Sequence, residues 1–124
     1  MNDSKVKSFL IPNKNQFDIH FYFTEETSES ALQIRKKLSE KFAFLTFYDP
    51  WYKPVGPHKQ PMWEADFSKT LNLNEDLGSV IIWLMENRGS HSILIHPHTG
   101  NSLADHTIHP IWLGDKLELN LSGL

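Results

Sequence analysis

The sequence predicts a single α+β domain of the ferredoxin-like class, with the element order β-α-β-β-α-β. Three observations predict it: strand-like runs, two segments of helical periodicity between them, and a composition that supports a core. Hydrophobic residues make up 40% and charged residues 22% of the 124 residues, which is typical of a globular domain. Two helices on one face of a four-stranded antiparallel sheet satisfy this order and leave the other face open.

Residues 17–23 are the first predicted strand, because aromatic and β-branched side chains dominate them. Successive side chains of a strand point to opposite faces. One face therefore carries Ile19, Phe21 and Phe23. The other carries Asp18, His20 and Tyr22, which is polar and aromatic rather than simply solvated.

A helix is predicted next, from a capping hydroxyl at Thr24 to about Phe42, because apolar residues recur three and four positions apart. A short strand is expected over residues 44–48. The loop over residues 49–61 contains four prolines and is expected to be stiff.

The second half repeats this pattern. Residues 62–67 alternate and predict a third strand, and a helix capped at residues 74–76 is closed by Gly89. Residues 92–96 form a fourth strand that Pro97 ends. Three alternating leucines favour a final strand: Leu117, Leu119 and Leu121. In this topology the first and third strands are central, and the fourth lies beside the first.

Composition and charge exclude several classes of function. The chain has no cysteine, which excludes disulfide scaffolds, cysteine nucleophiles and iron–sulfur clusters. A net charge of −3 gives no electrostatic footprint for nucleic acid. No apolar run is long enough for a signal peptide or a membrane span. We therefore expect a soluble, cytoplasmic protein with an N-terminal arm over residues 1–15 and one domain over residues 16–124.

Histidine is abundant, with seven residues in 124, and imidazole readily binds metals or moves protons near neutral pH. A metal site needs several ligands that converge from different elements. His20 projects from the first strand away from the helices, and His96 closes the neighbouring strand. His58 lies in a proline-bounded turn that holds an imidazole at low entropic cost. These three are the predicted metal ligands.

His106 is a further candidate, either as a fourth ligand or as the acid/base, and its neighbour Asp105 either orients it or caps a turn. Asp18 and Glu64 are the carboxylates available on the same predicted face. A hydrogen-bonded structural role is the alternative for each histidine. His91 and His98 are expected in solvated turns.

Six short motifs occur in the order typical of one family: residues 19–23, 54–58, 83–88, 96–100, 105–107 and 111–114. With these motifs the sequence resembles the DOPA 4,5-dioxygenase family over about residues 17–119. The resemblance implies extradiol cleavage of a catechol, such as DOPA or a related diphenol, by O2 at a non-haem Fe(II), which zinc or nickel can replace on purification. The histidines that recur in this family fall on His20, His58, His96 and His106.

Two positions depart from the family pattern, because Asp18 and Trp51 stand where many relatives carry histidines. They favour an alternative function, a non-enzymatic metal-binding or small-molecule-binding domain on the same scaffold. We also expect a homodimer, because one sheet face and Trp112 otherwise look uncovered.

Overall fold

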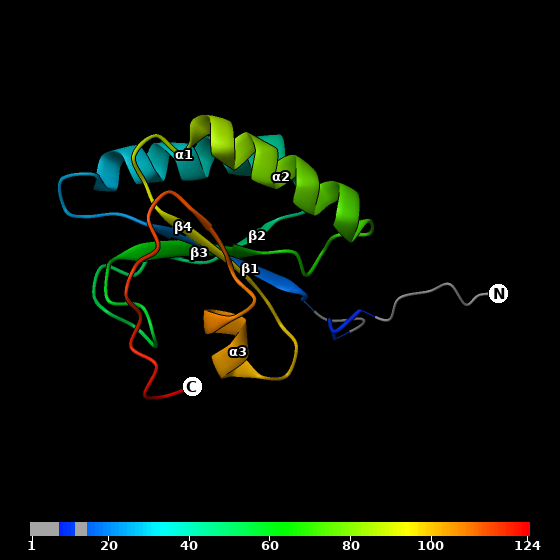
Figure 1. Ribbon diagram of the computed structural model, residues 1–124. Helices are drawn as coiled ribbons and strands as arrows, with labels where there is room; N and C mark the ends of the chain where they lie inside the picture. The colour runs from blue at the N-terminus through cyan, green and yellow to red at the C-terminus, as the bar shows by residue number, and fades with distance from the viewer. Residues whose placement is uncertain (1–7, 12–14) are drawn as a thin grey trace.

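The computed structural model describes residues 8–11 and 15–124. Its centre is a five-stranded sheet of order β2-β3-β1-β4-β5 in which every neighbouring pair is antiparallel (Figure 1). The strands are β1 (Phe17–Tyr22), β2 (Thr46–Phe47), β3 (Met62–Asp66), β4 (Ile93–Pro97) and β5 (Ile111–Leu113). The predicted ferredoxin-like order is confirmed, with β1 and β3 central and β4 beside β1.

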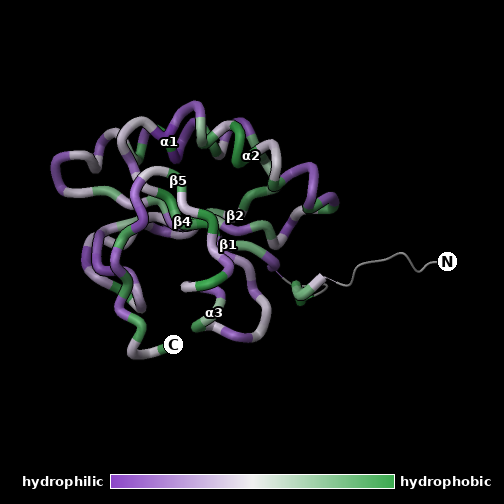
Figure 2. The backbone as a smooth tube through the Cα atoms, viewed as in Figure 1, coloured by the Kyte–Doolittle hydropathy of each residue, from purple (hydrophilic) through white to green (hydrophobic). Residues whose placement is uncertain are grey.

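Two long helices cover one face of the sheet: α1 (Ser28–Lys41) and α2 (Leu73–Asn87). The main core lies between these helices and the sheet, and buries Ile19 and Phe21 of β1 completely. Hydrophobic stretches of the strands therefore run through the middle of the molecule (Figure 2). Trp63 stacks on Phe21 at 4.6 Å and donates its indole N–H to the Ala31 carbonyl at 2.9 Å. This bond satisfies a buried polar group and ties β3 to α1.

Both helix starts differ from the sequence expectation. Helix α1 begins at Ser28, not at Thr24, because Thr24 is held in a turn in which its backbone N–H donates to the Thr27 hydroxyl at 2.8 Å. Helix α2 begins earlier than predicted, with Asn72 as its cap, since the first helical hydrogen bond runs from the Asp76 N–H to the Asn72 carbonyl.

The predicted final strand over residues 117–121 is wrong. The fifth strand is instead β5, which pairs with the free edge of β4. The leucine segment is an extended tail outside the sheet, and its backbone contacts the proline loop through a bridge from Leu119 to His58 and a hydrogen bond from the Asn120 N–H to the Pro57 carbonyl at 2.8 Å. Gly114, at φ +78°, makes the turn after β5 and sends the chain back. The alternation of the leucines arises because one side of the tail packs on an apolar cluster rather than pairing in the sheet.

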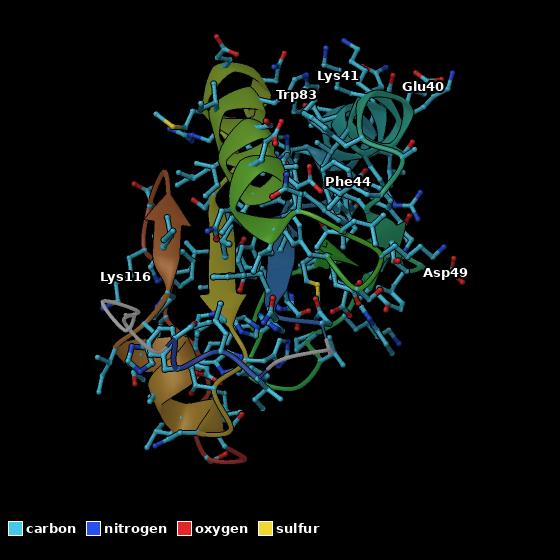
Figure 3. The ribbon with its side chains drawn as sticks, turned by 90° about the vertical axis from the view of Figure 1, so that its right-hand side faces the viewer. Glu40, Lys41, Phe44, Asp49, Trp83 and Lys116 are labelled. Carbon is cyan, nitrogen blue, oxygen red and sulfur yellow. The ribbon has the colours of Figure 1, made fainter. Side chains whose placement is uncertain are left out.

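The sheet face opposite α1 and α2 is covered by this tail and by a short third helix, α3 (Ser102–Thr107), which the sequence did not predict (Figures 1 and 3). Leu117, Leu119 and Trp112 pack there against Tyr22 and Leu94. The predicted arm over residues 1–15 lies largely outside the described residues. Among those described, the Ile11 N–H donates to the His98 carbonyl at 3.3 Å. No helix in the described part of the chain is long and apolar enough to cross a bilayer.

Candidate metal centre

The polar groups of the candidate site lie on the sheet face that α3 and the tail cover. In the register of the sheet, Asp18 of β1 stands opposite His96 of β4, and His20 stands opposite Glu64 of β3. Asp18 and His20 share one face because they are two residues apart on a strand. The alternation of side chains along the strand thus places Asp18 and His20 on the same sheet face as His96.

Three of these side chains form a compact group. The ligand atoms offered by Asp18, His20 and His96 all lie within 4.8 Å of one another. The Nε2 atoms of His20 and His96 are 3.1 Å apart, and the Asp18 Oδ2 atom is 3.6 Å from the His96 Nε2 atom. Two nitrogens bound to one metal ion at about 2.0–2.1 Å each are themselves roughly 3 Å apart. The spacing is that of a hydrogen bond between the rings, and it also fits two ligands of one metal ion.

The hydrogen bonds of the two imidazoles favour this interpretation. His96 donates its Nδ1–H to the Pro97 carbonyl at 3.0 Å, since a carbonyl only accepts. The neutral His96 ring therefore presents an Nε2 lone pair toward His20. The Nδ1 atom of His20 is buried without any partner. Without a metal, the Nε2–H of His20 donates to the His96 lone pair. A cation between the rings would instead bind both Nε2 lone pairs, with the His20 proton on Nδ1.

The electrostatics keep these histidines neutral, which is the form that binds metals. Burial, together with the neighbouring His58, His96 and His106, holds the pKa of His20 well below its ordinary value. Burial likewise lowers the pKa of His96, and with the charges of His106 and His96 it lowers the pKa of His58 to about 4.

Asp18 is held as an ionised carboxylate. It accepts hydrogen bonds from the Asn15 amide at 2.6 Å and from the His98 Nε2 at 2.9 Å. Burial alone would raise its pKa, but the hydrogen bonds from His98 and Asn15 and the charges of His98 and His96 together hold the pKa below its ordinary value. The same contact raises the pKa of His98. His98 was expected to be solvated surface, and its side chain is 38% exposed, but the hydrogen bond to Asp18 gives it a role that the expectation did not include.

His58 lies beside this group. Its ring centroid is 4.0 Å from that of His20, and its Nδ1 is hydrogen-bonded to the Tyr22 hydroxyl at 2.7 Å. Burial raises the pKa of Tyr22, so its hydroxyl keeps its proton. A metal would bind His58 through Nε2, with the Nδ1–H donating to the Tyr22 hydroxyl oxygen. His58 as a ligand stays a prediction. Asp18, rather than His58, completes the compact group.

His106 approaches from α3, with its ring centroid 4.2 Å from that of His96 and 6.4 Å from that of His58. It donates its Nδ1–H to the Ser102 carbonyl at 2.7 Å. Asp105 caps a turn, since its two oxygens accept from the Thr99 hydroxyl and the Thr99 backbone N–H at 2.6 and 2.9 Å. The four predicted histidines therefore meet, although their individual roles stay predictions.

Two other side chains clarify the limits of the site. The pKa of Glu64 is raised by burial and by the charges of Asp18 and Asp66, and Glu64 lies outside the compact group.

The expectation that His91 is solvated surface is wrong: it is 5% exposed, and its ring nitrogens meet the Tyr22 carbonyl and the Ser30 hydroxyl at 2.9 and 3.0 Å. It has a structural role between β1 and α1, which its position in a Ser-His-Ser turn did not indicate.

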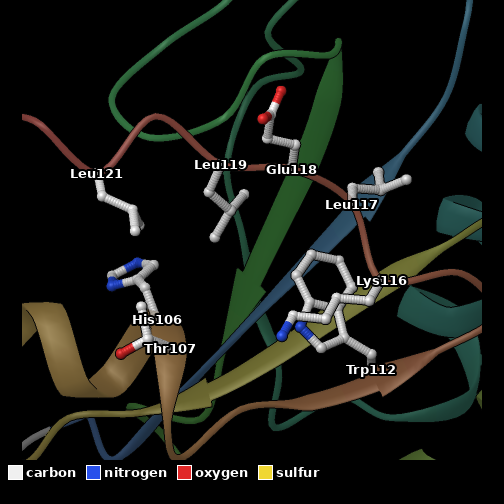
Figure 4. A pocket seen from close by; sticks show the side chains of 8 residues that line it. All are labelled: His106, Thr107, Trp112, Lys116, Leu117, Glu118, Leu119 and Leu121. Carbon is white, nitrogen blue, oxygen red and sulfur yellow. The ribbon is translucent and has the colours of Figure 1, made fainter.

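Two hollows border the histidines. One, of about 210 Å³, is lined by His96, His98 and His106 together with the loop that precedes α3. The other, of about 300 Å³, has His106 on one side and Trp112 on the other (Figure 4). His106 lines both, so the two hollows adjoin at its side chain.

This fold and this site define a small α+β protein with a buried centre of imidazoles and one carboxylate that suits a divalent metal. The family model for the Dopa 4,5-dioxygenase family matches residues 17–123, and the chain belongs to that family.

Individual relatives agree. The chain is 34% identical over 119 residues to an uncharacterized 21.2 kDa protein of Botryotinia fuckeliana, covering 88% of this chain and 63% of that protein. It is 30% identical over 132 residues to a DOPA 4,5-dioxygenase of Amanita muscaria, covering 98% and 55% respectively. The chain thus spans less than two thirds of the length of these curated relatives. A crystal structure of a "putative dioxygenase" from Nostoc punctiforme superposes with a TM-score of 0.78 at 33% identity, covering 88% of this chain and 90% of that one.

Proposed function

We propose that this protein is a non-haem iron dioxygenase that cleaves the ring of a catechol with O2 by the extradiol route. The observation that carries the proposal is the pair of Nε2 atoms of His20 and His96 at 3.1 Å with the Asp18 carboxylate beside them. Two imidazoles and one carboxylate are the donor set that non-haem Fe(II) oxygenases use, with open positions left for other ligands.

His20 and His96 are the two imidazole ligands in this proposal, and Asp18 is the third donor. His58 is the competing third donor through its Nε2 atom. Asn15 and His98 hold Asp18 in place by hydrogen bonds, and such partners of a ligand tune both its orientation and its basicity. Fe(II) at this centre supplies the redox chemistry that carries both atoms of O2 into the ring-opened product, so no external reductant is required.

His106 is the proposed acid/base. It lies beside His96 and lines both hollows. A catechol bound where the two hollows meet therefore has a hydroxyl group near the His106 imidazole. The hydrogen bond of its Nδ1 to the Ser102 carbonyl fixes the ring and leaves Nε2 to take a proton and return it. The apolar side chains of the tail exclude water from this side of the site.

Oxygen consumption tests the proposal. Purified protein reconstituted with Fe(II) is mixed with a panel of catechols in an oxygen electrode, and we expect oxygen uptake with a yellow ring-fission product. The variant His106→Ala should bind metal normally but lose most of the uptake. His109→Ala is the matched control because its ring packs on Phe9 outside the metal group. His91 does not serve as a control, since it is buried and hydrogen-bonded.

Metal binding without oxygen uptake for any catechol would contradict the enzyme and support the alternative, a non-enzymatic metal-binding or small-molecule-binding domain. Zinc or nickel in the purified protein is compatible with either function, so reconstitution precedes the assay. The homodimer and the cytoplasmic location also stay predictions. Sedimentation that gives only monomer at micromolar concentration would contradict the homodimer.

A further inference from the structure

The cavity of about 300 Å³ beyond His106 is larger than the metal-side hollow. It lies between α3, β5 and the tail, and its volume is at the small end of ligand sites, which suits a molecule with one aromatic ring. The leucines of the tail form an apolar wall: Leu117, Leu119 and Leu121. Figure 4 shows His106 and Trp112 facing each other across this cavity.

The side opposite His106 carries two unused hydrogen-bond donors. The Nε1 atom of Trp112 is buried and has no partner, although buried indole N–H groups normally find one. The indole is fixed by stacking on Tyr22, with ring centroids 6.0 Å apart and planes 17° apart. Lys116 reaches into the same side of the cavity (Figure 4). Its ammonium group makes no ion pair with any residue that the structure describes.

The charge of this side is positive because its one acidic lining residue is already paired. Glu118 accepts a hydrogen bond from the Lys59 ammonium at 2.6 Å. Its carboxylate points away from the cavity in Figure 4. Among the described lining residues, a bound anion would therefore find one cation and one N–H group without a partner. A bound ammonium group would find no unpaired carboxylate.

We propose that Lys116 and Trp112 form the end of the substrate site that recognises an anionic group, so that the substrate is a catechol with a short carboxylate side chain and no required amine. The inference rests on the proposed function, because the catechol ring is placed at the His106 side. A carboxylate at the far side gains charge-assisted hydrogen bonds, which are about twice as strong as neutral ones. An amino acid side chain such as that of DOPA also brings an ammonium group that finds no partner there.

Three probes that differ only at the end of the side chain test this: 3-(3,4-dihydroxyphenyl)propanoate, 4-propylcatechol and dopamine. Their binding to the Fe(II)-loaded protein is measured by anaerobic calorimetry. We expect the propanoate to bind at least about tenfold more tightly than 4-propylcatechol, and dopamine most weakly. Equal affinity for the propanoate and 4-propylcatechol overturns the proposal.

Variants locate the effect. Lys116→Met should weaken propanoate binding about tenfold and leave 4-propylcatechol unchanged, and Lys116→Glu should reverse the preference toward dopamine. Trp112→Phe should weaken the propanoate several-fold, because it removes one donor. Lys41→Met is the matched control, since Lys41 is exposed on α1 across the sheet from this cavity (Figure 3). Equal weakening of both probes by Lys116→Met contradicts an anion-specific role.

Oxygen uptake with the same probes separates this inference from the proposed function. Uptake that is equally efficient with the propanoate and 4-propylcatechol leaves the dioxygenase standing and overturns the anion-recognising end. Binding that prefers the propanoate, with no uptake for any catechol, overturns the dioxygenase and keeps the binding preference.

Discussion

His20 and His96 place their Nε2 atoms 3.1 Å apart across neighbouring strands, although 76 residues separate them in the sequence. The register of β1 and β4 creates this contact, because it sets Asp18 directly opposite His96 and leaves His20 one pleat further along the same face. The candidate site is therefore built on two paired strands, in which residues 17–21 of β1 pair with residues 93–97 of β4. Ligands on strands are positioned more precisely than ligands on loops.

The first prediction concerns this pair. His20→Ala and His96→Ala should each lower metal affinity by at least about a hundredfold, because each removes one of the three proposed ligands. The fold should persist, since the main core of β1, β3 and the two helices lies on the other face. Metal content after dialysis and far-UV circular dichroism measure the two effects. Full metal retention by either variant, with His109→Ala as the reference, would place the metal elsewhere.

The identity of the third donor gives a second prediction. Asp18→Asn keeps the shape and the hydrogen bond from His98 but removes the negative charge, and it should weaken metal binding about tenfold to a hundredfold. His58→Gln should weaken it much less, since the nearest donor atoms belong to Asp18, His20 and His96. Isothermal titration with a divalent metal compares the two variants. The opposite order would assign the third position to His58.

A third prediction concerns the metal-free protein at acid pH. The folded-state pKa of His58 is about 4, against 6.5 in the unfolded chain, and burial also holds the pKa of His20 well below its ordinary value. Between these values the unfolded state binds more protons than the folded state, so stability rises with pH. The stabilisation is fully present above pH 6.5 and is lost as pH falls toward 4. His58 alone contributes on the order of 3 kcal/mol across this range.

Urea denaturation of the chelator-treated protein at pH 7 and pH 5 measures this loss. The variant His58→Asn should flatten the dependence, because it removes a titrating group while keeping a polar side chain next to Tyr22. Equal free energies of unfolding at both pH values in the parent protein would contradict the shifted pKa values.

The order of the elements and the sheet topology could be predicted from the sequence because they depend on local periodicity. The alternation around Phe21 and the helical spacing around Val80 are each visible in a short window. The pairing of the strands then followed from the ferredoxin-like topology that the β-α-β-β-α-β order predicts. It also brought His20 next to His96, so half of the candidate site followed from topology alone.

The region after β4 could not be predicted in the same way. The leucines at 117–121 alternate as a strand does, but they pack on an apolar cluster as an extended tail. Helix α3 has only six residues, too few for a periodic signal. The sequence placed Asp18 on the correct face, but its contact with His98, which reaches it across 80 residues, escaped prediction. Such contacts are tertiary and leave no local pattern.

The last prediction concerns the turn that sends this tail across the sheet face. Gly114 has φ +78°, and a Cβ added there would lie 2.7 Å from the Arg88 Nη1 atom and 3.3 Å from the His91 carbonyl oxygen. Arg88 has little freedom to withdraw, because the same nitrogen donates to that carbonyl at 2.9 Å. Gly114→Ala should therefore destabilise the protein by about 1–3 kcal/mol. Gly123→Ala is the matched control, since nothing lies within 4 Å of its added Cβ.

The turn also sets the position of Lys116 two residues later, so Gly114→Ala should weaken binding of 3-(3,4-dihydroxyphenyl)propanoate more than binding of 4-propylcatechol. Thermal unfolding and calorimetry measure the two effects, and a Gly114→Ala protein as stable as Gly123→Ala would show that the turn tolerates a side chain.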